Sequence, residues 1–259
     1  MAFTMGLDIG SASSKGIVMA ARKILGTFEC PSGGDLKLTA DRIREALLSK
    51  SGLATREIAR TLATGFGSQM VTYADGIKTD ISCHAKGIAY LSPSVRTAID
   101  VGDLYSKVFR LDDHGNAVNF VHSGKCAGGS GRILQIIAKV LQVKVEDIGN
   151  LSLKSKKRVD FSTGCVVFAE SEAVSRIAEG TAKEDLLAGI HRALAAQLNS
   201  LAERITIEKD LALVGGGARD AGLVKAMEEI TGYEIIVPPQ PQLTAALGAA
   251  IIAGESLRT

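Results

Sequence analysis

The sequence predicts an α/β protein built from two related lobes, and three observations carry this prediction. Gly6–Gly10 (GLDIG) returns as Ala98–Gly102 (AIDVG), so a short apolar strand running into Asp-apolar-Gly occurs twice. The chain holds 28 Gly but only 5 Pro, a balance that favours tight glycine turns over a proline-punctuated all-β fold. Its 259 residues suit one large domain or two small ones. We expect one lobe of residues 1–95 plus 242–259 and a second of residues 96–241.

Composition excludes several classes of function. A net charge of +2 predicts no binding to nucleic acid or to an anionic membrane, and the absence of Trp argues against a platform for stacked bases. The longest apolar run, Leu243–Ala253, falls short of the roughly 20 residues that a spanning helix needs. Asp8 interrupts the apolar N-terminus, and no basic segment precedes it, so we expect no signal peptide and a cytoplasmic location.

The first lobe begins as a β-hairpin. Residues 5–8 and 16–19 are apolar strands, and the small residues 10–15 form the turn between them. Residues 41–49 have helical spacing, with Thr39 or Asp41 as the N-cap. A buried strand at 61–64 and a small-residue helix at 82–91 follow.

The second lobe restarts the pattern with a strand at 97–101. The elements expected after it in this lobe are strands at 104–111 and 117–121, helices at 133–141, 166–179 and 186–205, a strand at 212–214, a helix at 223–231 and a strand at 234–237. A closely packed helix at 243–253 then returns to the first lobe.

Three glycine turns follow short apolar strands, at Gly10, Gly102 and Gly215. Free backbone N–H groups at such turns bind anions, and glycine lets a phosphate approach. Asp8 and Asp100 would lie beside these phosphates and suit Mg²⁺ held partly through water. The turn residues expected to bind a nucleotide are Gly10, Ser11, Ser13, Lys15, Gly102, Gly215, Gly216 and Gly217. The alternative is a set of ordinary turns with solvated Asp. Neither a P-loop nor a dinucleotide fingerprint is present.

Two cysteines precede predicted helices in Gly- and Ser-rich surroundings, at Cys126 and Cys165. A helix N-terminus favours a thiolate, and the small neighbours would let backbone groups approach an iron–sulfur core. Because two cysteines are too few for one cluster, a cluster shared between two subunits would satisfy the count. The alternative is a pair of buried apolar thiols. Cys30 and Cys83 are expected to be structural. His84 is a candidate catalytic residue, although a structural role is the more common fate.

A set of motifs across nearly the whole chain resembles one family. They are Leu7–Ser11 with Lys15, Ala63–Gly67, Ser82–Ala85, Lys125–Gly131, Cys165 with Val167–Ser171, Gly189–Arg192 and Gly215–Gly217. Together they resemble the ATPase components of benzoyl-CoA reductases and the activators of 2-hydroxyacyl-CoA dehydratases, within the superfamily of actin, sugar kinases and heat-shock chaperones.

The resemblance implies a two-lobed actin/sugar-kinase-like (RNase H-like) ATPase fold, with ATP or ADP and Mg²⁺ in the cleft and Asp8 and Asp100 acting on them. It also implies that Cys126 and Cys165 bind half of a [4Fe–4S] cluster shared across a subunit interface. ATP hydrolysis would then drive low-potential electrons from a ferredoxin-type donor to subunits that reduce or dehydrate a CoA thioester.

One departure from the family pattern helps to distinguish a reductase subunit from a dehydratase activator. Activators of this family usually carry Asp-Ile-Gly-Gly-Gln-Asp at the second turn, whereas this chain has Asp100–Tyr105 (DVGDLY). The loss resembles the divergent ATPase subunit of benzoyl-CoA reductases, which predicts a heterodimer and slow hydrolysis by this subunit alone. The alternatives are a homodimeric activator of a 2-hydroxyacyl-CoA dehydratase or of a related double-cubane protein, a small-molecule kinase, and a non-enzymatic nucleotide sensor.

Overall fold

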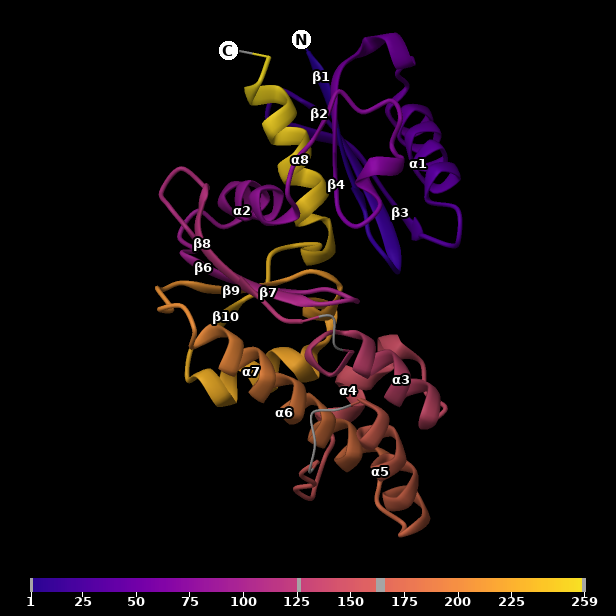
Figure 1. The fold of residues 1–259 in the computed structure, drawn as a ribbon, viewed down its shortest axis with the longest axis vertical. Helices are drawn as coiled ribbons and strands as arrows, with labels where there is room; N and C mark the ends of the chain where they lie inside the picture. The colour runs from indigo at the N-terminus through magenta and orange to yellow at the C-terminus, as the bar shows by residue number, and fades with distance from the viewer. Residues whose placement is uncertain (1, 125–126, 162–165, 258–259) are drawn as a thin grey trace. The chain divides into compact units, whose positions relative to one another are not determined.

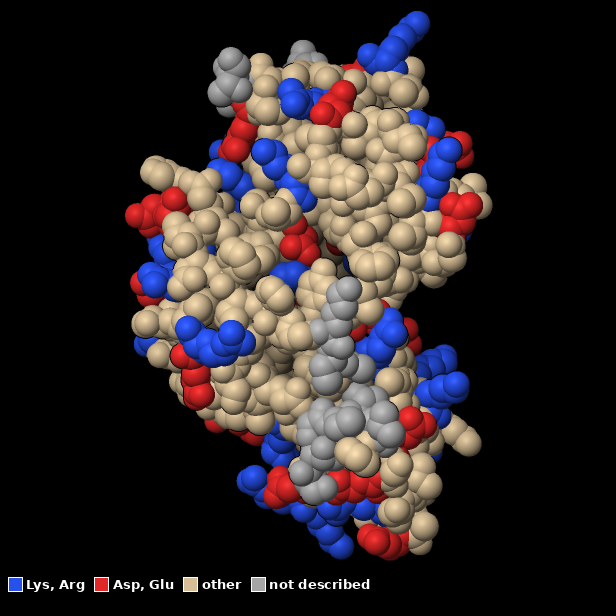
Figure 2. Space-filling view, in the orientation of Figure 1, with Lys and Arg blue, Asp and Glu red and all other residues tan. Residues whose placement is uncertain are grey.

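A computed structural model of the chain describes residues 2–124, 127–161 and 166–257 (Figure 1). The chain forms two compact units. Unit 1 comprises Met1–Ser94, Leu111–Val118 and Leu243–Thr259, and unit 2 comprises Val95–Arg110 and Asn119–Gln242. On the visible face, basic and acidic side chains are interspersed (Figure 2), in keeping with the small net charge. None of the helices in the described ranges combines the length and apolar character needed to cross a membrane.

Unit 1 contains a five-stranded sheet with helices on both faces. The sheet order is β3-β2-β1-β4-β5, with β1 antiparallel to β2 and parallel to β4. Its elements are β1 (Phe3–Ile9), β2 (Ser13–Ala20), β3 (Lys23–Pro31), α1 (Leu36–Ser51), β4 (Ile58–Thr64), β5 (Gly76–Ile77), α2 (Asp80–Leu91) and α8 (Thr244–Glu255).

The two faces of β1 bury different partners because side chains alternate along a strand. Met5 and Leu7 pack with Ile43 and Leu47 of α1. On the opposite face α8 lies against the backbone of β1, since a Cβ at Gly6 would lie 2.1 Å from the Ala246 carbonyl oxygen.

The α2–α8 pair is packed equally closely. A Cβ at Gly248 would lie 1.6 Å from the Cys83 carbonyl oxygen, and one at Gly87 would lie 2.0 Å from the Thr244 carbonyl oxygen. The expectation of a closely packed small-residue helix near the C-terminus is therefore confirmed.

Unit 2 repeats the strand order of unit 1. Its sheet has the order β10-β9-β6-β7-β8, with β6 antiparallel to β7 and parallel to β9. Its strands are β6 (Thr97–Val101), β7 (Ser106–Leu111), β8 (Ala117–His122), β9 (Leu211–Val214) and β10 (Ile235–Ile236). Its helices are α3 (Arg132–Val140), α4 (Ile148–Ser152), α5 (Val166–Ala178), α6 (Lys183–Ala202) and α7 (Ala221–Thr231). One core joins Ile99, Val101 and Val108 of the sheet to these helices.

In the first lobe one prediction was wrong in detail and one strand was missed. Helix α1 begins at Leu36 because Asp35 accepts a hydrogen bond from the Leu38 N–H at 2.9 Å. Thr39, one of the two expected caps, instead lies inside the helix and donates to the Ser32 carbonyl at 2.6 Å. The strand β3 was not expected, because its side chains are mostly exposed or half-buried and show no apolar alternation.

Candidate functional site

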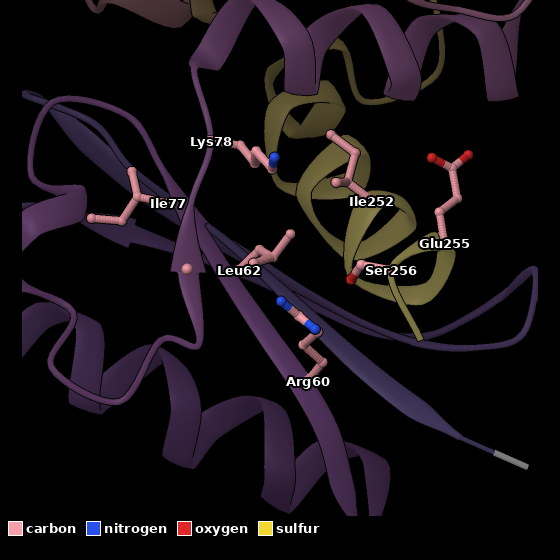
Figure 3. A pocket seen from close by; sticks show the side chains of 8 residues that line it. Arg60, Leu62, Ile77, Lys78, Ile252, Glu255 and Ser256 are labelled. Carbon is pink, nitrogen blue, oxygen red and sulfur yellow. The ribbon is translucent and has the colours of Figure 1, made fainter. Parts of the chain in front are cut away.

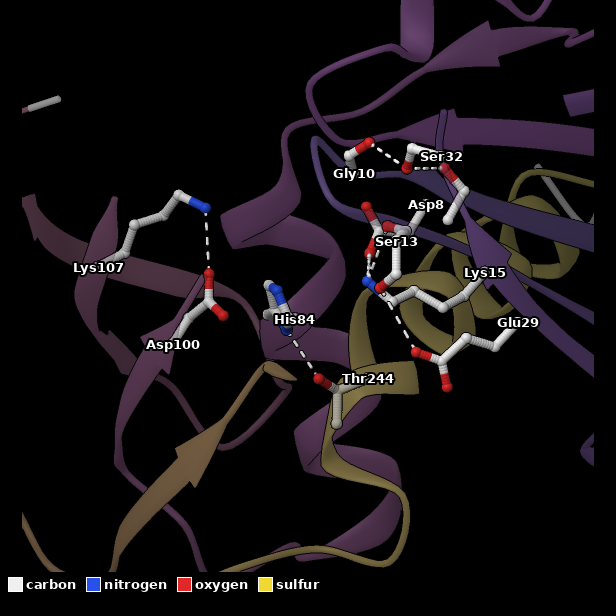
Figure 4. Close-up of polar contacts among 11 residues, drawn as sticks. Asp8, Gly10, Ser13, Lys15, Glu29, Ser32, His84, Asp100, Lys107 and Thr244 are labelled. Atoms are coloured by element: carbon white, nitrogen blue, oxygen red, sulfur yellow. Dashed lines mark hydrogen bonds and ion pairs between the residues drawn. The ribbon is translucent and has the colours of Figure 1, made fainter. Parts of the chain in front are cut away.

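The first glycine turn, residues 8–13, places an acid beside a base. Asp8 on β1 is the register partner of Lys15 on β2, and both side chains are largely buried. The Lys15 Nζ lies 3.6 Å from Asp8 Oδ2 and donates a hydrogen bond to the Ser13 carbonyl at 3.1 Å (Figure 4). The amino group of Lys15 therefore lies at the turn, as expected, and is held between two oxygen acceptors.

The second turn, residues 100–105, repeats this geometry in unit 2. Asp100 on β6 is the register partner of Lys107 on β7, and Lys107 Nζ lies 3.1 Å from Asp100 Oδ2 (Figure 4). The same amino group lies 4.7 Å from the centre of the Tyr105 ring. Lys107 was not among the residues expected from the sequence. Its signal was available, because Lys follows Asp by seven positions in both turns.

A glycine supports each aspartate. Gly65, after β4, has φ +87°, and a Cβ there would lie 2.3 Å from Asp8 Oδ1. Gly215, after β9, has φ +82°, and a Cβ there would lie 2.2 Å from Asp100 Oδ1. At both positions only glycine combines this backbone conformation with such close contact to a carboxylate. Gly65 is therefore a second residue that the sequence patterns did not assign to the site.

The turns themselves are equally tight. A Cβ at Gly10 would lie 2.4 Å from the Ser13 carbonyl oxygen, and one at Gly102 would lie 2.8 Å from that of Tyr105. The Gly10 carbonyl accepts a hydrogen bond from Ser32 Oγ at 2.7 Å. Each unit therefore presents a compact, glycine-dependent turn beside a buried Asp–Lys pair.

The third glycine segment leaves β9 as a short 3₁₀ turn. The Gly215 N–H donates to the Pro241 carbonyl at 3.1 Å, and the turn Gly216–Arg219 leads into α7. A Cβ at Gly216 would meet nothing within 4 Å, so this backbone is open. At the start of α7, the carboxylate of Asp220 contacts the buried His191, whose Nε2 lies 3.0 Å from Asp220 Oδ2.

His84 is buried on α2 and lies at the contact with α8. Its Nδ1 is 2.7 Å from Thr244 Oγ1 (Figure 4). This hydrogen bond between two helices supports the structural role over the catalytic one.

The cysteines fall into two groups. Cys126 and Cys165 lie outside the described residues, while α5 begins at Val166, directly after Cys165. Cys30 and Cys83 are buried free thiols, and desolvation raises the pKa of Cys83 to about 12. Within the described ranges, no three His, Cys, Asp or Glu side chains gather as a metal site.

The cavity in Figure 3, of about 450 Å³, lies apart from the glycine turns of unit 1. Its lining comprises Arg60, Leu62, Gly76, Ile77, Lys78, Ile252, Glu255 and Ser256. Glu255, at the C-terminal end of α8, lines this cavity together with the cationic residues Arg60 and Lys78.

Several known proteins are similar to this chain along almost its whole length. It is 42% identical to the 2-hydroxyisocaproyl-CoA dehydratase activator of Clostridioides difficile, over 99% of this chain and 96% of the relative. It is 39% identical to the (R)-2-hydroxyglutaryl-CoA dehydratase activating ATPase of Acidaminococcus fermentans, over 97% of this chain and 96% of the relative. A benzoyl-CoA reductase component from Thauera aromatica is 29% identical, over 97% and 93%.

Solved structures agree with this result. Component A of the (R)-2-hydroxyglutaryl-CoA dehydratase of A. fermentans is 38% identical, with a TM-score of 0.96 and full coverage of both chains. The C. difficile activator with bound ADPNP is 40% identical, with a TM-score of 0.93 over 99% of this chain and 96% of that one.

A glucokinase of the ROK family from Streptomyces griseus is 14% identical with a TM-score of 0.61, over 98% of this chain and 99% of that one. This likeness concerns the fold alone, and it confirms the predicted α/β fold of the actin and sugar-kinase type. A family match covers residues 5–253. The chain therefore belongs to the BadF/BadG/BcrA/BcrD ATPase family.

Proposed function

We propose that this chain is the ATP-hydrolysing activator of a 2-hydroxyacyl-CoA dehydratase. The observation that carries the proposal is similarity along the whole chain to activators of such dehydratases, at 42% and 39% identity. The benzoyl-CoA reductase component is more distant, at 29% identity. The sequence patterns alone favoured the divergent benzoyl-CoA reductase subunit and left the homodimeric activator as an alternative. The identities now favour the activator.

Each unit has a glycine turn at which nucleotide phosphates would bind. Backbone N–H groups at Gly10 and Gly102 would face phosphates, with Ser11 and Ser13 beside them, and the open backbone at Gly215–Gly217 would lie near the adenosine. Lys15 and Lys107 neutralise the two buried aspartates, which lowers the cost of keeping carboxylates near a polyphosphate. The bound ADPNP in the C. difficile relative supports a triphosphate as ligand.

The proposal includes the two inorganic groups that the family implies. Asp8 and Asp100 each offer one carboxylate for Mg²⁺, directly or through water. Cys126 and Cys165 offer thiolates, and two copies of the chain would complete four ligands for a [4Fe–4S] cluster. The cluster, when bound, supplies the low-potential electron that passes to the dehydratase component. A ferredoxin-type protein would be the donor.

The unusual second turn does not remove the phosphate site. Asp103 introduces a carboxylate, but its Oδ2 lies 2.6 Å from Arg132 Nη2, so its charge is compensated away from the turn. This hydrogen bond also raises the pKa of Arg132, which stays protonated. Tyr105 occupies the place of the second family Asp and offers no carboxylate. We therefore still expect slow ATP hydrolysis by the chain alone, and this feature keeps the reductase component as the second candidate.

The decisive experiment is anaerobic purification followed by activation assays. The proposal expects a brown protein with one four-iron cluster per two chains that activates a purified 2-hydroxyacyl-CoA dehydratase component when ATP and reduced ferredoxin are supplied. Cys126→Ser and Cys165→Ser should lose the iron and retain nucleotide binding. Cys30→Ser is the matched control and should keep its iron. A colourless wild-type protein, or activation of a benzoyl-CoA reductase component only, would contradict the proposal.

A further inference from the structure

The second turn is tied to the beginning of α3 through its backbone. The Gly131 N–H donates to the Gly102 carbonyl at 2.8 Å, and Ser130 Oγ donates to the Asp103 carbonyl at 2.7 Å. Two consecutive carbonyls of the turn thus accept hydrogen bonds from the residues that open α3. These two hydrogen bonds attach the turn to the residues that open α3, close to the first residues of the helix.

The Asp103 side chain adds a third attachment. Its carboxylate is 10% exposed. It accepts hydrogen bonds from Arg132 Nη2 at 2.6 Å and from Gln135 Nε2 at 3.2 Å. The two donors are three positions apart and so share one face of α3. A largely buried carboxylate with two side-chain donors has little freedom to rotate toward solvent.

Unit 1 provides an internal comparison. The residue three positions after Asp8 is Ser11, where unit 2 has Asp103 three positions after Asp100. The Gly10 carbonyl is held by a serine hydroxyl, that of Ser32, rather than by the start of a helix. A neutral Ser11 cannot form the ion pair, so this attachment is particular to the second turn.

We propose that Asp103 is a positioning residue that couples the nucleotide state of the second turn to the start of α3. The inference rests on the proposed binding of nucleotide phosphates at Gly102. Phosphate binding adjusts the turn, and the carboxylate transmits this adjustment to Arg132 and Gln135. The conformation at the start of α3, the helix that follows Cys126 in the sequence, then differs between the diphosphate and triphosphate states. Asp103 itself need not touch the nucleotide.

Hydrogen exchange measured by mass spectrometry tests the coupling in the full-length protein. Exchange of the amides of residues 127–141 is compared with Mg-ADP and with a non-hydrolysable Mg-ATP analogue, and calorimetry measures the affinity for both. The wild type should show a difference between the two nucleotides. Arg132→Gln and Asp103→Asn should lose most of it while affinity remains of the same order.

Two further variants separate coupling from mere stability. Exchanging the charges, with Asp103→Arg and Arg132→Asp together, should restore at least half of the wild-type difference. Arg158→Gln removes the exposed pair with Asp160, whose Nε–Oδ2 distance is 2.9 Å, and should leave the difference intact. A lower melting temperature alone would not reproduce this pattern.

The outcomes are distinguishable. A wild type that binds no nucleotide refutes the proposed function and the inference with it. A wild type that binds both nucleotides without any difference at residues 127–141 refutes the inference alone. An Arg132→Gln variant with the full wild-type difference does the same.

Discussion

Replacing Lys107 by Met tests whether the second Asp–Lys pair is a buried unit. The change keeps an unbranched side chain and removes the charge, which leaves Asp100 without the partner 3.1 Å from its Oδ2. The side chains of Lys107 and Asp100 are only 8% and 5% exposed, so water offers little compensation.

The magnitude follows from the geometry. At 3.1 Å and an effective dielectric constant of about 20, the attraction between the two charges is about 5 kcal/mol. Much of it offsets the desolvation of both groups, but removing one partner leaves the desolvated charge behind and costs about 3 kcal/mol. A loss of this size lowers the folding equilibrium constant by about a hundredfold.

Urea unfolding and hydrogen exchange of β6 and β7 measure this loss in the nucleotide-free protein. Arg158→Met, in an exposed ion pair, is the matched control and should have little effect on stability. Adding Asp100→Asn to Lys107→Met should recover more than about 1 kcal/mol of the free energy of unfolding, because the double variant no longer buries the carboxylate charge of Asp100 without Lys107. If Lys107→Met is as mild as the control, or if the double variant recovers nothing, the pair is not a buried electrostatic unit.

Three more outcomes are expected. Gly215→Ala should lower stability by about 1–3 kcal/mol, since φ 82° and ψ −176° suit glycine alone, and it should weaken Mg-ATP binding in calorimetry by displacing Asp100. Gly216→Ala, in open space, is the control for stability and should leave the free energy of unfolding unchanged. Asp185→Asn should destabilise the protein at pH 7. The backbone N–H groups of Lys157 and Lys156 hold the pKa of Asp185 below its usual value, so the deficit should shrink as the pH falls below about 4 in urea titrations; a constant deficit contradicts this. Burial raises the pKa of Cys83 to about 12. The thiol should therefore resist iodoacetamide at pH 8 until the protein unfolds, which peptide mass spectrometry can measure.

Sequence patterns predicted elements where apolar periodicity was strong. The strand β6 and the helices α5 and α8 agree with expectation to within a few residues. The edge strand β3 could not be predicted, because its exposed side chains leave no alternating signal and only pairing with β2 defines it. The start of α1 was misplaced because several polar residues could cap it, and only the fold selects Asp35.

The sequence predicted the glycine turns of the candidate site and their aspartates. It did not predict all of the residues that contact these aspartates. The repeated Asp-apolar-Gly pattern found Asp8 and Asp100, because a strand followed by a turn is a local feature. Gly65 comes to Asp8 from the end of a neighbouring strand, which is a contact distant in the sequence. Lys107 lies only seven positions after Asp100 and faces it across the strand pair, so its spacing could have been noticed. The anchoring of Asp103 to α3 has no local signature at all, since its partners lie 29 and 32 positions away.

Gly65 and Gly215 contact the two aspartates in the same way. The effects of equivalent substitutions in the two units can therefore be compared within one protein. Each substitution near one aspartate has a twin near the other, with nearly the same backbone angle and the same approach distance to a carboxylate. Temperature, buffer, ligand and expression are then identical for both measurements. An inequality between the twins reports on differences between the two units, among them Ser11–Ser13 in one and Asp103–Tyr105 in the other. The functional asymmetry of the two halves can thus be measured inside a single polypeptide, without recourse to a second protein.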